Sequence, residues 1–120
     1  MTSERAILLV GHGTIRDVSD VPEFLRRIRR GRPAGEALVT EIQRRYRVIG
    51  QSPLLETTGS LGRAREARLG LSVHTAMRFW SPLVEDVLAR IVQDGVRQLC
   101  ILPVAPFSVH VYASVVSEAL

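Results

Sequence analysis

The stretch Leu8-Leu9-Val10-Gly11-His12-Gly13-Thr14 decides the fold class of this 120-residue chain. A short apolar run closed by glycine predicts a buried parallel strand, here over residues 6–10. The glycines on either side of His12 let the backbone turn sharply or approach a ligand closely. Because ligands of open α/β sheets collect at the carboxyl edge of the strands, His12 is a candidate for handling a metal or a proton at the mouth of a cleft. The alternative is a histidine that merely tolerates a tight turn.

Strand and helix signals alternate along the rest of the chain. Apolar residues recur at helical spacing between turn residues, and two further short apolar runs are typical of strands. The order β-α-α-α-β-α-β-α predicts an α/β fold, a parallel sheet flanked by helices, with residues 1–120 forming a single domain. Three strands make a thin sheet, so we expect either a longer protein or pairing with another copy. We expect helices over 22–30, 36–49, 52–69, 81–95 and from about Ala113 to Leu120, and strands over 72–77 and 98–102.

The charge of the chain is positive and unevenly spread. All 16 basic residues are arginines, and against 12 acidic residues they give a net charge of +4. They gather most densely within 26–32 and 44–47. Nucleic-acid-binding domains usually add exposed aromatic residues or a recognisable reading module, whereas this chain has one Trp, two Tyr and three Phe and no such module. Since the planar guanidinium group suits carboxylates, we expect a small molecule with several carboxylates as the partner, and no nucleic acid.

Cysteine usage and hydropathy indicate a cytoplasmic protein. Cys100 is the only cysteine, which excludes an internal disulfide and a cysteine-based zinc site. It stands in an apolar run, so we expect it to be buried and inert. No apolar run reaches the roughly 18 residues of a membrane span, and residues 1–5 lack the pattern of a secretory signal. We therefore expect no transmembrane segment and a location in the cytoplasm.

Each predicted strand is followed by residues that carry chemistry. His12 follows the first strand and Arg78 the second, while His110 and Tyr112 lie in the segment after the third. The carboxyl ends of parallel strands meet at one edge, so these side chains should converge on one rim. Neutral imidazole is a common ligand for iron, cobalt, nickel and zinc and also serves as a general base. His12 and His110 are thus candidate metal ligands, although neither belongs to a spaced motif such as His-x-x-x-His.

Several motifs resemble the ferrochelatase family, and they occur in the family's order. An arginine pair precedes glycine at 29–31, and residues 45–54 read Arg-Tyr-Arg-Val-Ile-Gly-Gln-Ser-Pro-Leu, similar to the family's R-Y-x-x-I-G-G-x-S-P-L signature. The segments 76–82, 93–96 and 101–112 resemble the strand-to-helix turn, helix end and strand–loop unit that follow. The resemblance spans nearly all 120 residues. It departs at Gly50, which stands alone where the family has two glycines.

This resemblance implies a chelatase-like domain over residues 1–120, the amino-terminal half of the two-domain ferrochelatase fold and so part of a longer protein. The implied activity is insertion of ferrous iron into a porphyrin, coproporphyrin or protoporphyrin, at the close of haem synthesis. Ferrous iron is then the substrate metal, and no cofactor is required. His12 stands where the family has a tyrosine that can ligate iron, and the family's metal-inserting histidine and its partner glutamate belong to the other half, so no catalytic residue is assigned here. By position, the resemblance places six residues at or near the macrocycle and its carboxylates: Arg29, Arg45, Tyr46, Ser52, Arg78 and Tyr112.

Other interpretations stay open beside this one. Residues 10–13 are also similar to the small single-domain chelatases that load metal into sirohydrochlorin. Those proteins work as homodimers, and their two metal-binding histidines match His12 and, roughly, His110. A homodimeric chelatase is therefore an alternative, as are a non-catalytic tetrapyrrole-binding domain and a basic nucleic-acid module. The arginine and Ser-Pro-Leu motifs favour the ferrochelatase family.

Overall fold

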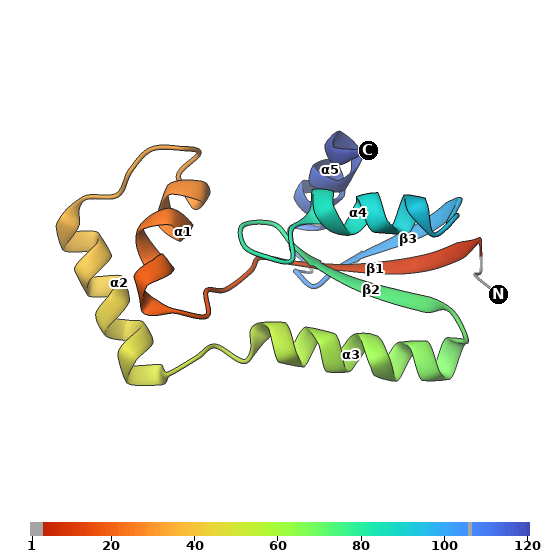
Figure 1. The fold of residues 1–120 in the computed structure, drawn as a ribbon, viewed down its shortest axis with the longest axis horizontal. Coiled ribbons are helices and arrows are strands. Elements are labelled where there is room, and N and C mark those ends of the chain that lie inside the picture. The colour runs from red at the N-terminus through yellow and green to blue at the C-terminus, as the bar shows by residue number, and fades with distance from the viewer. Residues whose placement is uncertain (1–3, 106) are drawn as a thin grey trace.

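A three-stranded parallel sheet forms the centre of the molecule (Figure 1). The computed structural model describes residues 4–105 and 107–120. The strands are β1 (Arg5–Gly11), β2 (Ser72–Met77) and β3 (Gln98–Pro103), in the spatial order β2-β1-β3. β1 is buried from its second residue onward because it has a strand on each side and helices on both faces. The predicted α/β fold with a parallel sheet is confirmed.

Helices cover the two faces of the sheet unequally. The helix α3 (Leu54–Leu69) lies on one face, and α4 (Val84–Gln93) and α5 (Val109–Ala119) lie on the other (Figure 1). Gly62 of α3 faces the sheet, where a Cβ would lie 3.4 Å from Val73 and 3.6 Å from Leu9, at ordinary van der Waals distance. None of the helices in the described part of the chain is long and apolar enough to cross a membrane.

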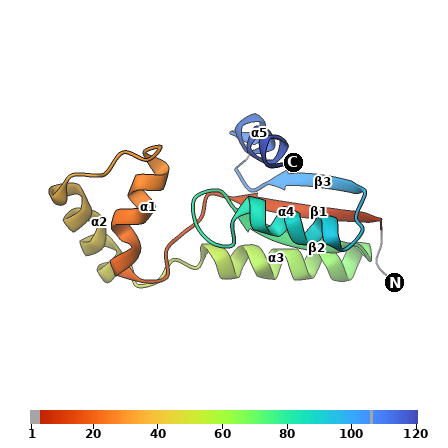
Figure 2. The same cartoon turned by 45° about the horizontal axis from the view of Figure 1, so that its top comes forward.

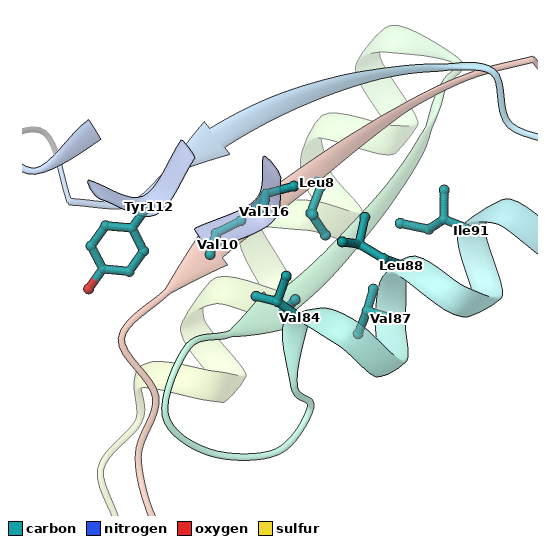
Figure 3. Close-up of a cluster of buried hydrophobic side chains, with 9 residues drawn as sticks. Leu8, Val10, Val84, Val87, Leu88, Ile91, Tyr112 and Val116 are labelled. Carbon is teal, nitrogen blue, oxygen red and sulfur yellow. The ribbon is translucent and has the colours of Figure 1, made fainter. Parts of the chain in front are cut away.

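The main core lies between the sheet and the α4–α5 layer. Residues of alternate strand positions, such as Leu8 and Val10, point to this face. They meet the apolar faces of α4 and α5, where Val84 and Val116 are almost fully buried (Figure 3). Each fully buried aliphatic side chain of this kind contributes about 1.5–3 kcal/mol. The full cluster is Leu8, Val10, Ala76, Val84, Val87, Leu88, Ile91, Tyr112 and Val116.

A helical hairpin stands apart, beyond the carboxyl edge of β1 (Figures 1 and 2). It comprises a 3-10 turn, η1 (Val18–Asp20), and the helices α1 (Val21–Ile28) and α2 (Glu36–Ile49). Its placement makes the molecule elongated, 50 × 27 × 27 Å. A second, smaller cluster of Ile15, Val21 and Phe24 holds the hairpin together.

Two sequence-based predictions are wrong. The last helix begins at Val109, not near Ala113, so His110 and Tyr112 lie on its first turn and not in a loop. The β-branched residues there hide the helical spacing, which shows in the burial of Tyr112 and Val116 four positions apart. Cys100 is exposed and not buried. β3 is an edge strand, and the register sets Cys100 beside Ile7 on the face that α3 only partly covers.

Candidate functional site

The segments that follow β1 and β2 are tied together at the carboxyl edge of the sheet. The Arg78 amide donates a hydrogen bond to the Gly11 carbonyl at 2.9 Å, and the Phe79 amide donates to the His12 carbonyl at 3.0 Å. Gly13 adopts φ +110°, and a Cβ there would lie 3.0 Å from the Trp80 amide nitrogen. Glycine is therefore required at this position both for its conformation and for the close approach of the two segments.

These backbone contacts bring an imidazole, a guanidinium group and several aromatic rings together. The His12 ring meets the Phe79 ring edge-on, with 4.9 Å between centroids, and the Phe24 ring at 6.2 Å. The guanidinium carbon of Arg78 lies 4.6 Å from the centroid of the Phe79 ring and 5.8 Å from that of Tyr112. We call His12, Phe24, Arg78, Phe79 and Tyr112 the rim cluster. It unites three of the residues predicted from the strand ends.

The surroundings of His12 disfavour its protonated form. Partial burial between the aromatic rings lowers the pKa of His12 below its usual value, and the nearby positive charge of Arg78 lowers it further. One side of the residue is still exposed to solvent. A neutral imidazole that solvent can reach has a free nitrogen lone pair, so it can accept a proton or ligate a metal.

Tyr112 joins the rim to the core. Its ring is almost fully buried and closes one end of the main cluster, and its hydroxyl group points away from that cluster (Figure 3). It comes from α5, while the other members of the rim cluster come from α1 and from the segments after β1 and β2.

Tyr46 and Ser52 lie on the hairpin side of the same edge. The hydroxyl groups of Tyr46 and Thr14 are 3.4 Å apart, which links α2 to the segment after β1. Ser52 lines a hollow of about 290 Å³ together with Thr14, and Tyr46 lines a neighbouring hollow of about 200 Å³. The Ser52 hydroxyl also accepts a hydrogen bond from the Leu54 amide at the start of α3. These two predicted residues therefore adjoin the rim.

Arg29 and Arg45 lie on the hairpin, outside the rim cluster. Arg29 is half-buried at the end of α1, and its Nε is the one buried side-chain nitrogen or oxygen in residues 4–105 and 107–120 that lacks a hydrogen-bond partner. Arg45 is exposed and bonded to Glu41 at 3.1 Å. Glu41 also binds Arg44 at 2.8 Å, and hydrogen bonds from the two arginines lower the pKa of Glu41 to about 2. In the described structure, no hydrogen bond, ion pair or ring contact joins Arg29 or Arg45 to His12.

His110 is exposed on the first turn of α5. No contact between its ring and His12 occurs in the described ranges. Among these residues, no group of three or more His, Cys, Asp or Glu side chains could hold a metal ion. The pairing of His12 with His110 in a metal site stays a prediction.

Phe24, Phe79, Trp80 and Arg27 are not among the site residues that the sequence predicts. Arg27 lies 5.0 Å from the centroid of the Trp80 ring, and Phe24 meets the same ring at 5.8 Å. Phe79 and Trp80 follow a strand directly, as Arg78 does, so the same signal would have identified them. Phe24 and Arg27 come from α1, and only the fold brings them to the rim.

The structure is thus an α/β domain whose cationic and aromatic side chains gather at the carboxyl edge of a parallel sheet. The family model described as Ferrochelatase matches residues 4–119. The chain therefore belongs to the ferrochelatase family, as its motifs predict.

Individual proteins that are similar to this chain are also ferrochelatases. The chain is 38% identical over 106 residues to a ferrochelatase of Acidobacterium capsulatum, covering 88% of this chain and 33% of the relative. It is 32% identical over 124 residues to a ferrochelatase of Deinococcus radiodurans, covering 95% of this chain and 39% of the relative. A coproporphyrin III ferrochelatase of Frankia alni is 33% identical over 105 residues, and the match covers 86% of this chain and 27% of the relative. The chain thus spans about a third of the length of these relatives.

Proposed function

We propose that this chain forms one wall of a ferrochelatase active site and binds a porphyrin while ferrous iron is inserted during haem biosynthesis. The observation that carries the proposal is the rim cluster, in which His12, Arg78 and Tyr112 come from three separate elements to one edge. Family membership supplies the class of reaction.

Each part of the rim suits one feature of a porphyrin. Aromatic rings such as Phe79 pack against a flat macrocycle. Guanidinium groups form paired hydrogen bonds with carboxylates, which suits the acidic side chains at the porphyrin edge. Arg29 has a donor without a partner, its Nε, which is buried in this structure and would meet a substrate carboxylate once the side chain turns outward. Neutral His12 is available to ligate iron or to accept a proton.

The site that this chain provides is shallow. The hollows beside Tyr46 and Ser52 measure about 200 and 290 Å³, and pockets that enclose a small molecule typically measure about 300–1,000 Å³. We therefore propose that other parts of the enzyme cover the macrocycle and supply the remaining chemistry. The alternative is a second copy of this chain, as in the small homodimeric chelatases.

We propose coproporphyrin as the substrate in preference to protoporphyrin. Eight of the sixteen arginines lie within 26–47, and coproporphyrin offers more carboxylates to bind. The coproporphyrin III ferrochelatase of Frankia alni is among the relatives. Iron enters as a substrate, so the proposal needs no other cofactor. The exposed thiol of Cys100 suits the reducing conditions of the cytoplasm.

A porphyrin titration tests the proposal. Quenching of coproporphyrin III fluorescence should show saturable binding to the chain, and Arg29→Gln should weaken it by about ten-fold or more, since a hydrogen bond to a charged group contributes about 1.5–3 kcal/mol. Arg68→Gln, which removes the same charge from the last turn of α3, is the matched control. Equal affinity of the two variants would contradict the role of Arg29, and absence of saturable binding would contradict the function.

A further inference from the structure

Trp80 is the residue through which the helical hairpin meets the segment after β2. The loop between β2 and α4 extends from the sheet toward α1 (Figures 1 and 2). On this loop, the Trp80 ring meets the Phe24 ring edge-on, with 5.8 Å between centroids, and the guanidinium carbon of Arg27 lies 5.0 Å from its centroid. In residues 4–105 and 107–120, these are the ring contacts that join α1 to the loop.

The loop that carries Trp80 is itself fixed to the sheet. The Met77 amide donates a hydrogen bond to the Pro82 carbonyl at 2.6 Å, which closes the loop at its base. A Cβ at Gly13 would lie 3.0 Å from the Trp80 amide nitrogen, so the Trp80 backbone approaches the segment after β1 closely. Trp80 therefore offers the hairpin a fixed point of attachment to the sheet.

The helix α1 presents one face to this attachment point. Phe24 and Arg27 are three positions apart, so they lie on the same face of the helix. Phe24 is 5% exposed and belongs to the small hairpin cluster. Arg27 pairs with Glu23 at 3.4 Å, and its charge is attracted to the face of the indole ring. One aromatic contact and one cation–π contact thus hold α1 to Trp80.

Arg29 stands at the end of the same helix but on another side. It follows Arg27 by two positions, which places it about 200° further round the helix axis, since an α-helix turns about 100° per residue. Its Nε has no hydrogen-bond partner. In the described part of the chain, no hydrogen bond or ring contact joins Arg29 to Trp80. Any effect of Trp80 on Arg29 therefore passes through the position of α1.

We propose that Trp80 is a positioning residue for the porphyrin, because it holds α1 where Arg29 reaches a carboxylate of the ligand that the rim cluster binds. This inference rests on the function proposed above and adds the link between the rim and the hairpin. The hairpin needs such a link, since its cluster has three buried residues and α2 contributes none of them. In this role Trp80 acts through α1 and not by contact with the macrocycle.

A double-mutant cycle between Trp80 and Arg29 tests the proposal, with quenching of coproporphyrin III fluorescence as the measure of affinity. Residues that act independently give additive losses, whereas coupled residues do not. Trp80→Leu should weaken binding by about five-fold or more in the parent chain, but by less than about two-fold in the Arg29→Gln variant. The position of α1 no longer affects the affinity once the guanidinium group of Arg29 is absent.

A conservative variant separates positioning from simple loss of structure. Trp80→Phe keeps a ring against Phe24 and Arg27, so it should bind coproporphyrin III within about two-fold of the parent. Urea unfolding checks that each variant is folded. If Trp80→Leu does not fold, Phe24→Leu takes its place in the cycle, since it removes one of the two contacts with the indole ring at similar side-chain volume.

The attachment of α1 can also be measured without porphyrin. Trp80 is the only tryptophan of the chain, so quenching of its fluorescence by acrylamide reports how well α1 covers it. Arg27→Gln should raise the quenching constant. Arg26→Gln is the matched control, because Arg26 also pairs with Glu23, at 3.6 Å, and loses the same charge but has no cation–π contact with the ring. It should leave the quenching constant unchanged.

Three results would overturn the proposal. Additive losses in the cycle would show that Trp80 acts independently of Arg29. A loss of affinity in Trp80→Phe as large as in Trp80→Leu would show that the ring contacts with α1 do not position the hairpin. Equal quenching constants in Arg27→Gln and Arg26→Gln would show that the cation–π contact does not hold α1.

The parent chain separates this inference from the proposed function. Saturable binding of coproporphyrin III by the parent, together with additive losses in the variants, would contradict the role of Trp80 alone. Absence of saturable binding by the parent would contradict the proposed function, and the positioning role would fall with it.

Discussion

The sheet and the helical hairpin differ in how firmly they are packed. The cluster between the sheet and the α4–α5 layer has nine buried residues, four of them on α4 alone. The hairpin cluster has three, and α2 contributes no buried residue to it. Val48 and Ile49, at the end of α2, are 73% and 68% exposed. The sheet therefore holds its side chains in fixed places, whereas the hairpin has much less buried surface to hold it.

The two regions also differ in charge. Half of the arginines lie on the hairpin, within 26–47. Arginines that bind a flexible, multiply charged substrate gain from a support that can adjust, and low-stability segments often carry binding. In the rim cluster, His12 and Phe79 instead come from the ends of strands, whereas Phe24 comes from the hairpin and Tyr112 from α5. Under the function proposed above, the strand ends would set the position of the reacting centre, and the hairpin would adjust to the periphery of the ligand.

The sharpest test of this comparison is a pair of core truncations. Leu8→Ala removes a fully buried side chain from the sheet and should destabilise the protein by about 2–5 kcal/mol. Ile42→Ala, at a half-buried position of α2, should cost about 1 kcal/mol or less, because little buried surface is lost. Urea unfolding followed by circular dichroism measures both.

Hydrogen exchange extends this test to single amides. Amides of α2 should exchange faster than those of β1 in the parent protein, and Ile42→Ala should speed exchange in the hairpin alone. Equal destabilisation by the two truncations would break the comparison, because the hairpin would then be as firmly packed as the sheet.

Gly13→Ala tests the junction between the two regions. The added methyl group would lie 3.0 Å from the Trp80 amide nitrogen, at φ +110°. We expect a loss of about 1–3 kcal/mol and weaker packing of Phe79 against His12. Gly70→Ala is the matched control, since Gly70 also has a positive φ but nothing lies within 4 Å of its added Cβ. If Gly13→Ala is no less stable than Gly70→Ala, the close contact at Gly13 does not contribute to stability.

A third prediction concerns the titration of His12. Because its pKa is lowered in the folded state, the unfolded chain binds more protons as the pH falls below about 6.5. The contribution of His12 to stability is therefore complete above that pH and is lost as the pH falls toward the folded pKa. NMR titration should give a pKa below 6.5, and Arg78→Gln should raise it by removing a positive charge. An unchanged pKa in Arg78→Gln would show that Arg78 does not act on the imidazole.

Much of the sheet could be predicted from local patterns. The helix 36–49 and the strand 72–77 have the predicted bounds because their turn residues and apolar spacing agree with their tertiary setting. Burial of Cys100 was misjudged because an apolar strand looks the same in sequence whether it lies at the centre or at the edge of a sheet. Strand order depends on contacts between distant residues, which periodicity does not record.

The candidate site was predictable where it lies on the strand ends. His12 and Arg78 meet because parallel strands end at one edge, a consequence of topology alone. The contribution of Phe24 depends on how the hairpin folds back on the rim. No short-range sequence pattern predicts this long-range contact. The pairing of Glu41 with Arg45 was within reach of the sequence, since residues four apart on a helix are neighbours.

The ion pair between Glu41 and Arg45 gives the smallest predicted effect and refines the role of the hairpin. At pH 7 Glu41 is ionised, since its pKa is about 2, and it occupies Arg44 and Arg45. A substrate carboxylate must compete with it, so Glu41→Gln should tighten coproporphyrin binding by about two- to five-fold, as expected for an exposed ion pair. Glu66→Gln on α3 makes the same change in charge away from these arginines and should leave the affinity unaltered. If Glu41→Gln instead weakens binding, Glu41 holds Arg45 in the orientation that the ligand needs, and the hairpin is more preorganised than its sparse packing implies.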